Sequence, residues 1–180
     1  MKKWYVILIA AFSVVFVMCL FVFSDTPKAE DTTARLNVAS LGSYELDTNH
    51  FHMENVEGKD VRLGKLRSYD ALLITKDYIY QTDQKALKKK LNKVDIPLLF
   101  ADFEEESSIA FLTTELPLSE AKMAGKGTIQ MAFTLPNHEL ATFSIFDTSR
   151  ESLDQLNKAI QLVQRVKNLE EWETRSVKTF

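Results

Sequence analysis

The sequence is poor in the residues that build many reactive sites. It contains one cysteine, Cys19, so no internal disulfide can form, and neither a cysteine zinc site nor a catalytic thiol is available in the rest of the chain. The signatures Gly-x-Ser-x-Gly and His-Glu-x-x-His are absent. Gly125 and Gly127 lack the spacing of a phosphate-binding loop and indicate a turn. The common hydrolase, metalloprotease and P-loop motifs are therefore excluded.

An excess of basic charge is also lacking. Lysine and arginine total 22 against 25 aspartate and glutamate residues, for a formal net charge of -3. Such a chain has no general basic surface to neutralise a phosphate backbone, so the sequence predicts no nucleic-acid partner. Hydrophobic residues make up 46% of the 180 residues, with only 5 glycines and 4 prolines. This composition is typical of a globular protein, and the length indicates one domain plus an accessory segment.

The longest uncharged apolar run lies near the N-terminus, over residues 4–23. At about 1.5 Å per residue, a helix of this length spans roughly 30 Å, the thickness of a bilayer's hydrocarbon core. Lys2 and Lys3 precede the run and acidic residues follow it, so the positive-inside rule places the N-terminus in the cytoplasm. The sequence predicts a single-pass cell-membrane protein that contacts the lipid bilayer through residues 4–23. The bulk of the chain is then extracytoplasmic, and the absence of Asn-x-Ser/Thr acceptors fits a bacterial envelope protein.

Two alternatives apply to this N-terminal run. Cleavage after Ser24 would release a secreted protein, although signal peptides more often have an apolar core of about 7 to 15 residues. Acylation of Cys19 would require small residues ahead of it, whereas the preceding residues are bulky. We therefore expect residues 1–24 to form an uncleaved membrane anchor, residues 25–34 a polar linker and residues 35–180 the extracytoplasmic domain.

Short apolar runs alternate with helical segments in this external part. Helical periodicity is present over residues 83–94 and 149–172. The runs with β-strand character are 36–41, 44–56, 71–75, 96–101, 109–113, 129–135 and 140–146.

The C-terminal helical segment is the best specified element. Thr148 or Ser149 can cap it, and Glu151 stands in the capping-box position relative to Thr148. The same periodicity puts Gln161 and Gln164 on or near the exposed side. We expect a broad apolar face to pack on a sheet, formed by Leu153, Leu156, Ile160, Leu162, Val163, Val166 and Leu169.

The order of these segments predicts the fold class. The runs 71–75 and 96–101 are continuously apolar, as in strands buried on both faces of a parallel sheet, and a helical segment lies between them. The runs 129–135 and 140–146 are close enough to form an antiparallel hairpin. After the N-terminal transmembrane helix, we therefore predict a small α/β domain. Its sheet is mixed, with a parallel βαβ first half and an antiparallel hairpin later, and the long C-terminal helix packs on it.

Carboxylates follow the predicted parallel strands. In open α/β sheets, ligands bind beyond the carboxyl ends of such strands. Asp77 follows the run 71–75, and Asp102 and Glu104 follow the run 96–101. These three residues are the predicted ligand-binding residues, able to hold a divalent cation or to receive a cationic partner. The alternative is that residues 104–106 form a solvated loop.

His50 and His52 are the candidate metal ligands. Residues at i and i+2 of a strand point to the same face, so the two imidazoles could share a transition metal, with Asp47 and Glu54 close in sequence. The remaining histidine, His138, lies in the predicted hairpin turn. The alternative is a pair of solvent-facing histidines on an edge strand.

These features favour a non-catalytic binding or regulatory module of the cell envelope. We predict no cofactor, and we expect an envelope protein or polymer as the partner. One alternative is a metal-dependent extracytoplasmic hydrolase or transferase that uses His50 and His52. The other is a secreted protein released by signal-peptide cleavage.

Overall fold

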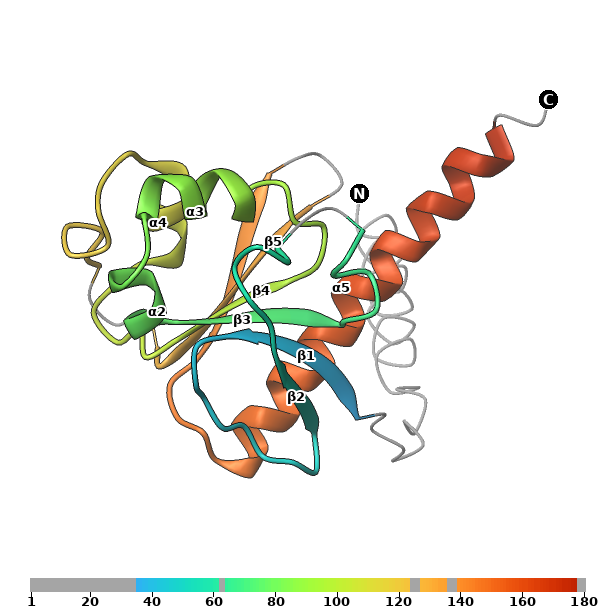
Figure 1. The fold of residues 1–180 in the computed structure, drawn as a ribbon. Coiled ribbons are helices and arrows are strands. Elements are labelled where there is room, and N and C mark those ends of the chain that lie inside the picture. Colours follow the sequence, from blue (N-terminus) through green and yellow to red (C-terminus); the bar gives the residue numbers. More distant parts are fainter. Residues whose placement is uncertain (1–34, 62–63, 124–126, 136–138, 178–180) are drawn as a thin grey trace, which may run out of the picture. The chain divides into compact units, whose positions relative to one another are not determined.

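The sheet places continuously apolar strands at its centre and partly polar strands at its edges. The computed structural model describes residues 35–61, 64–123, 127–135 and 139–177, with the side chains of the last helix described up to residue 167. Its six strands lie in the order β2-β1-β3-β4-β5-β6 (Figure 1). Every residue of β3 and β4 is buried, whereas β2 and β6 are partly exposed. The strand bounds are β1 Leu36–Leu41, β2 Phe51–Asn55, β3 Ala71–Thr75, β4 Leu98–Ala101, β5 Ile129–Thr134 and β6 Leu140–Ile145.

The mixed sheet predicted from the sequence is confirmed. β1 pairs in parallel with both β2 and β3, and β3 pairs in parallel with β4. β4 pairs antiparallel with β5, which forms an antiparallel hairpin with β6. At the hairpin end, the Leu135 N–H donates a hydrogen bond to the Glu139 carbonyl oxygen at 2.7 Å.

Two of the predicted strand runs are wrong in type or length. Residues 109–113 belong to a helix, α4 (Ser108–Thr113), because the Ser107 hydroxyl accepts a hydrogen bond from the Ala110 N–H at 3.2 Å and caps it. Helical and strand periodicity are hard to separate over so few residues. The run 44–56 contributes only β2, and the chain before β2 forms a loop in which Leu46 is buried.

The chain reverses its direction of travel across the sheet between β1 and β3. From β1 it moves outward to β2, then returns past β1 to β3 and continues to β4 on the other side. In open α/β sheets, such a reversal separates the connections that leave the two strands, and ligands bind at this point. A ligand site is therefore expected where residues 42–44 follow β1 and residues 75–77 follow β3.

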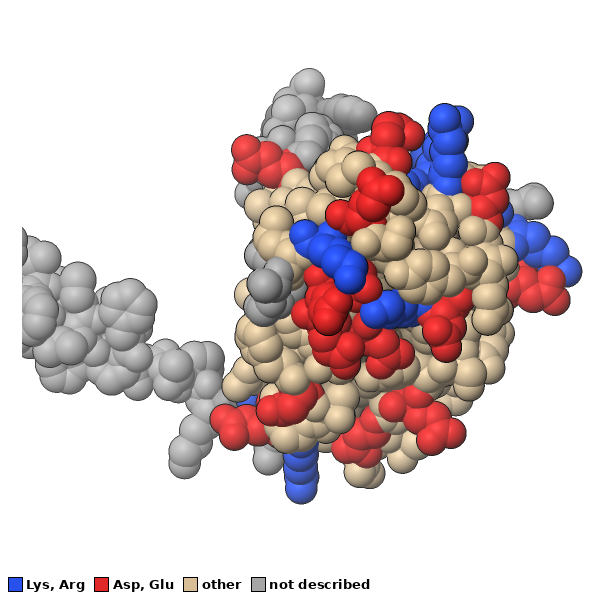
Figure 2. Space-filling model, turned by 90° about the vertical axis from the view of Figure 1, so that its left-hand side faces the viewer, with Lys and Arg blue, Asp and Glu red and all other residues tan. Residues whose placement is uncertain are grey.

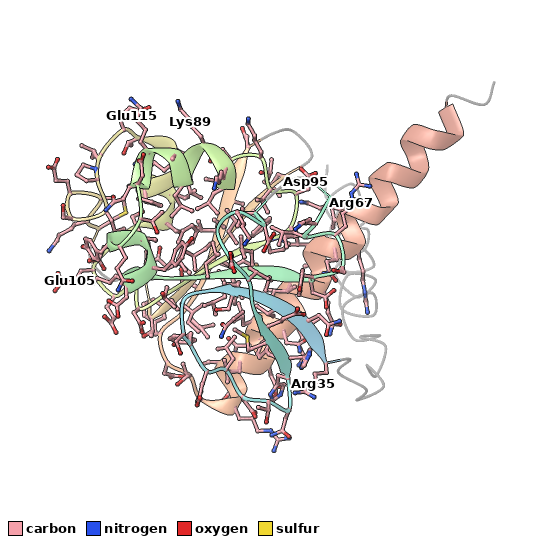
Figure 3. The ribbon with its side chains drawn as sticks, viewed as in Figure 1. Arg35, Arg67, Lys89, Asp95, Glu105 and Glu115 are labelled. Carbon is pink, nitrogen blue, oxygen red and sulfur yellow. The ribbon has the colours of Figure 1, made fainter. Side chains whose placement is uncertain are left out.

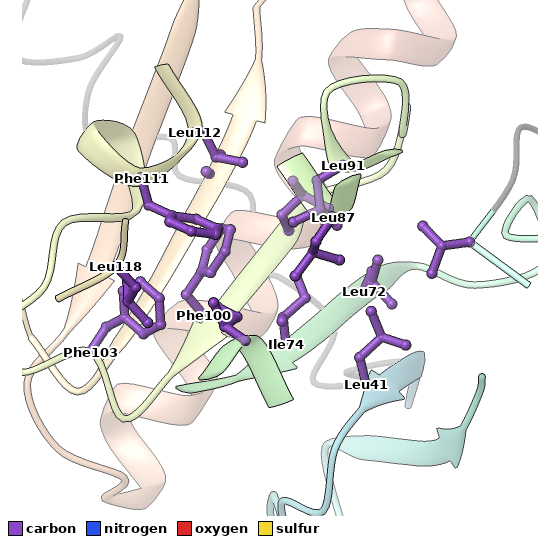
Figure 4. Packing of buried hydrophobic residues seen from close by; sticks show 14 of the residues in the cluster. Leu41, Leu72, Ile74, Leu87, Leu91, Phe100, Phe103, Phe111, Leu112 and Leu118 are labelled. Carbon is purple, nitrogen blue, oxygen red and sulfur yellow. The ribbon is translucent and has the colours of Figure 1, made fainter. Parts of the chain in front are cut away.

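Helices cover both faces of the sheet, giving three layers. The helices α2 (Lys76–Tyr80), α3 (Gln84–Leu91) and α4 pack on one face, and α5 (Arg150–Val177) packs on the other (Figure 1). Because successive strand residues point to opposite faces, β3 sends Ile74 to the first face and Leu73 to the second. Figure 4 shows the core of the first face, where the ring centroids of Phe100 and Phe111 lie 6.2 Å apart.

Both predicted helices are present and begin at side-chain caps. The Asp83 carboxylate accepts hydrogen bonds from the backbone N–H groups of Lys85 at 3.0 Å and Ala86 at 3.1 Å, and so caps α3. The Ser149 hydroxyl accepts one from the Ser152 N–H at 3.3 Å at the start of α5. Of the two residues predicted to cap the long C-terminal helix, Thr148 and Ser149, it is therefore Ser149 that caps it.

The apolar face of α5 is narrower than the sequence indicates. Leu162 is 63% exposed and Val166 is 37% exposed, so the expectation that they pack on the sheet is wrong. Gln164, expected near the exposed side, is half-buried, and its amide donates to the Asp70 carbonyl oxygen at 3.1 Å and carboxylate at 2.8 Å. The side chain of Leu169 lies outside the described residues. The residues that pack on the sheet are Leu153, Leu156, Ile160 and Val163.

Truncating Ile160 tests this packing. Ile160 is fully buried, so we expect Ile160→Ala to lower the free energy of unfolding by about 2 to 5 kcal/mol, through lost burial and a residual cavity. Leu162→Ala removes an exposed side chain from the same helix and is expected to change it by about 0.5 kcal/mol. Urea denaturation of both variants measures the contrast. Equal losses would show that α5 does not pack through Ile160.

The predicted anchor and linker, residues 1–24 and 25–34, lie outside the described residues, as does His138. Within the described part of the chain, no helix combines the length and the hydrophobicity needed to cross a bilayer. The membrane anchor therefore stays a prediction.

Candidate functional site

Three segments of the chain come together where β1, β3 and β4 end. Thr75 joins the first two, because its hydroxyl donates a hydrogen bond to the Leu41 carbonyl oxygen at 3.4 Å. The same hydroxyl accepts a hydrogen bond from the Tyr78 N–H at 3.2 Å and caps α2. One side chain thus fixes the end of β3 against the end of β1. The three segments, which we call the carboxyl edge, are residues 42–44, 75–77 and 102–106.

Gly42 occupies the tightest position at the carboxyl edge. Its φ of +97° is a conformation that favours glycine, and a Cβ on it would lie 2.1 Å from Thr75 Oγ1. Glycine is therefore required both by the backbone turn after β1 and by the close approach of Thr75.

Substituting this glycine tests the close approach. Gly42→Ala is expected to lower the free energy of unfolding by about 2 to 5 kcal/mol, because backbone strain and steric overlap add. Gly64→Ala is the matched control: Gly64 has a similar φ of +99°, but among the described residues other than its chain neighbours no atom lies within 4 Å of the added Cβ. It should lose about 1 to 2 kcal/mol from the backbone alone. Chemical denaturation compares the two, and equal losses would contradict the tight contact with Thr75.

The structure brings the three predicted carboxylates, Asp77, Asp102 and Glu104, into electrostatic interaction. Partial burial raises the pKa of Asp102, and the negative charges of Glu104 and Asp77 raise it further, while Lys76 opposes them. Burial also raises the pKa of Tyr44, with smaller contributions in the same direction from Asp102 and Glu104. The carboxyl edge is therefore a region of negative potential. Figure 2 shows this side of the molecule, where Asp and Glu side chains gather.

In the segment after β4, two exposed carboxylates flank a buried aromatic residue. Among the described residues other than glycine, only Asp102 has a positive φ, of +63°. Aspartate tolerates this left-handed conformation better than most residues. The next residue, Phe103, is fully buried, and its N–H donates to the Thr128 carbonyl oxygen at 3.1 Å. Asp102 and Glu104, on either side of Phe103, remain exposed.

The alternative prediction of a solvated loop over residues 104–106 is wrong for Glu106, because this residue is buried. Its side chain is 3% exposed, and its Oε1 lies 2.8 Å from the Lys76 ammonium. This hydrogen bond is the main cause that raises the pKa of Lys76. The second carboxylate oxygen, Oε2, is also buried, and none of the described residues forms a hydrogen bond with it. A buried carboxylate oxygen without a donor is costly, so the carboxyl edge retains an unused acceptor.

Gln130 holds the acidic segment in place, and sequence reasoning missed it. Its amide nitrogen donates to the carbonyl oxygens of Phe103 and Glu106, both at 2.7 Å, and its amide oxygen accepts from the Ser108 N–H at 2.9 Å. The side chain is buried, so these bonds fix the loop between β4 and α4. One signal was available, because Gln130 is the only polar residue in the run Ile129–Phe133.

The two candidate metal ligands differ in environment. His50 is buried just before β2, whereas His52 is exposed on β2. Both ring nitrogens of His50 face carboxylates: Nδ1 lies 2.9 Å from Asp47 Oδ2, and Nε2 lies 2.5 Å from Asp154 Oδ1. His50 thus ties the start of β2 to α5 and has no ring nitrogen left for a metal. In the described part of the chain, no three His, Cys, Asp or Glu side chains are grouped to hold a metal ion.

Charged residues lie at both ends of the parallel strands. Arg35 and Arg67 precede β1 and β3 and lie on the side of the amino ends, while Glu105 lies on the opposite side, after β4 (Figure 3). Asp95 lies on the same side as Arg67, so the amino ends of the strands carry charge of both signs.

Comparisons with protein-family models, with curated proteins and with solved structures find no match. The geometry of the carboxyl edge is therefore the basis for a functional proposal.

The raised pKa of Asp102, caused first by partial burial and then by the neighbouring carboxylates, has a measurable consequence. Because the pKa of Asp102 is raised in the folded state, its ionisation costs stability as the pH rises above the pKa of the unfolded chain, about 3.9. We expect Asp102→Asn, which keeps the side-chain shape, to be more stable than the wild type at pH 7. The difference should vanish near pH 2.5, where Asp102 is protonated in both states. Urea denaturation at the two pH values measures this, and a variant less stable than the wild type at pH 7 would contradict it.

Proposed function

We propose that the chain is a single-pass cell-membrane protein whose extracytoplasmic α/β domain is a non-catalytic binding module of the cell envelope. Its binding site is the carboxyl edge around Asp77, Asp102 and Glu104. Its partner is an envelope protein or polymer that presents positive charge. The proposal rests above all on the interaction of these three carboxylates beside the point where the chain reverses between β1 and β3.

The electrostatics of the carboxyl edge favour a positively charged partner. Asp102 and Glu104 are exposed, so a partner can reach them without unfolding the loop. Their mutual repulsion is relieved when a positive charge binds between them, and a ligand that binds only the folded state also stabilises it. Buried Phe103 and Gln130 keep the loop in one conformation, which lowers the entropic cost of binding.

The cell-membrane location is supported by the sequence. The uncharged run over residues 4–23 has the length of a membrane span, and Lys2 and Lys3 precede it. With the N-terminus in the cytoplasm, the domain lies outside the membrane.

Crosslinking on intact cells tests location and site together. A membrane-impermeant amine-reactive crosslinker should modify the domain from outside and join it to its partner. Asp102→Asn with Glu104→Gln should reduce this crosslinked species at least about fivefold, since it removes two of the carboxylates that attract the partner. The matched control is Asp95→Asn with Glu115→Gln, which removes the same charges away from the carboxyl edge (Figure 3).

Each result bears on one part of the proposal. Loss of the crosslinked species in the Asp102/Glu104 variant, with retention in the Asp95/Glu115 control, is the expected outcome. No modification from outside the cell would contradict the location. Equal crosslinking in both double variants would contradict the assignment of the carboxyl edge.

A further inference from the structure

The unused acceptor on Glu106 narrows the chemistry of the ligand. The carboxylate is buried, and Lys76 supplies a donor to only one of its oxygens. A carboxylate without protons accepts hydrogen bonds and donates none. A group that completes this site therefore brings either an N–H or O–H donor or a metal cation. Because the surroundings are acidic, a positively charged donor is favoured over a neutral one.

Lys76 itself shows which kind of cation this carboxylate accepts. Its primary ammonium lies 2.8 Å from Glu106 Oε1, the distance of a charge-assisted hydrogen bond. The carboxylates of Asp102, Glu104 and Glu106 interact at this edge with the ammonium of Lys76. The ammonium of Lys122 lies 3.1 Å from Glu105 Oε2 and also interacts with Glu106. With Asp77 included, five carboxylates face two ammonium groups, so the local balance is negative and leaves charge for a further ammonium.

We infer that the carboxyl edge binds the side-chain ammonium of a lysine in a peptide segment of the partner, with Glu106 as the deepest acceptor and Asp102 and Glu104 as the outer charges. This inference rests on the proposed function and names the ligand of that site. An ammonium has three N–H donors, so it can bond to Glu106 Oε2 and still reach an outer carboxylate. Oε2 is shielded from solvent, so the side chains that cover it must shift for the ligand to reach it, while Lys76 keeps its bond to Oε1.

A pair of synthetic peptides tests the inference with the full-length chain in detergent micelles. The probe is a fluorescein-labelled peptide, acetyl-Gly-Ser-Lys-Ser-Lys-Ser-Gly-amide, and its control is the same peptide with both lysines acetylated, which removes the positive charges. Fluorescence anisotropy measures the two dissociation constants. We expect the acetylated peptide to bind at least tenfold more weakly, and the affinity of the lysine peptide to fall as sodium chloride is added.

Variants separate the outer charges from the deep acceptor. Asp102→Asn with Glu104→Gln should weaken binding of the lysine peptide by about tenfold or more, and the control Asp95→Asn with Glu115→Gln should leave it unchanged. Glu106→Gln replaces one acceptor oxygen by an amide donor and should also weaken binding by about tenfold. Circular dichroism establishes that each variant is folded before its affinity is compared.

Three results would overturn the inference. Equal affinity for the lysine and acetylated peptides would show that the ammonium is not recognised. Equal affinity of the wild type and the Asp102/Glu104 variant would show that the peptide binds elsewhere. Binding of calcium chloride in place of the peptide, lost in the same variant, would assign the site to a divalent cation. The crosslinked species on cells can still depend on Asp102 and Glu104 when one of these three results is obtained. In that case lysine is not the ligand, and the proposed function still holds.

Discussion

Burial of the central strands on both faces is the constraint on which the rest of the structure depends. All residues of β3 and β4 are buried, with α2, α3 and α4 on one side and α5 on the other. A strand in this position has no solvent-exposed face on which to carry charge, because isolated buried charges are costly. Charged residues are therefore displaced to the strand ends, where Asp77 and Asp102 lie. The hydrophobic core thus determines where chemistry can occur in this domain.

Buried polar contacts of Thr75 and Gln130 fix the positions of the segments that carry these charged residues. The Thr75 hydroxyl joins the ends of β1 and β3, and the absence of a side chain at Gly42 permits that contact. Gln130 satisfies three backbone groups of the loop after β4. With its backbone fixed in this way, the loop keeps Asp102 and Glu104 exposed and like-charged at short range, although their repulsion would otherwise spread them. The negative potential of the carboxyl edge is therefore built into the fold.

The sequence was sufficient for the parallel character of the first half, the hairpin and the long helix, because continuous apolar runs and helical caps are local signals. It also placed Asp77, Asp102 and Glu104 together, since parallel strands end at the same edge. It failed for residues 109–113, where a side-chain cap and tertiary packing decide between helix and strand. The burial of Glu106 and the contact between His50 and Asp154 could not be predicted. Both depend on residues distant in the chain, Lys76 and Asp154 respectively.

Titration of the Asp102 carboxyl group shows whether the carboxyl edge concentrates negative charge around it. Carbon NMR of the folded chain, with the aspartate side chains labelled, gives the pKa of Asp102 in the wild type and in Glu104→Gln. We expect the pKa of Asp102 to lie above the ordinary aspartate value and to fall when the Glu104 charge is removed. An Asp102 pKa at or below the ordinary value, unchanged by Glu104→Gln, would contradict it.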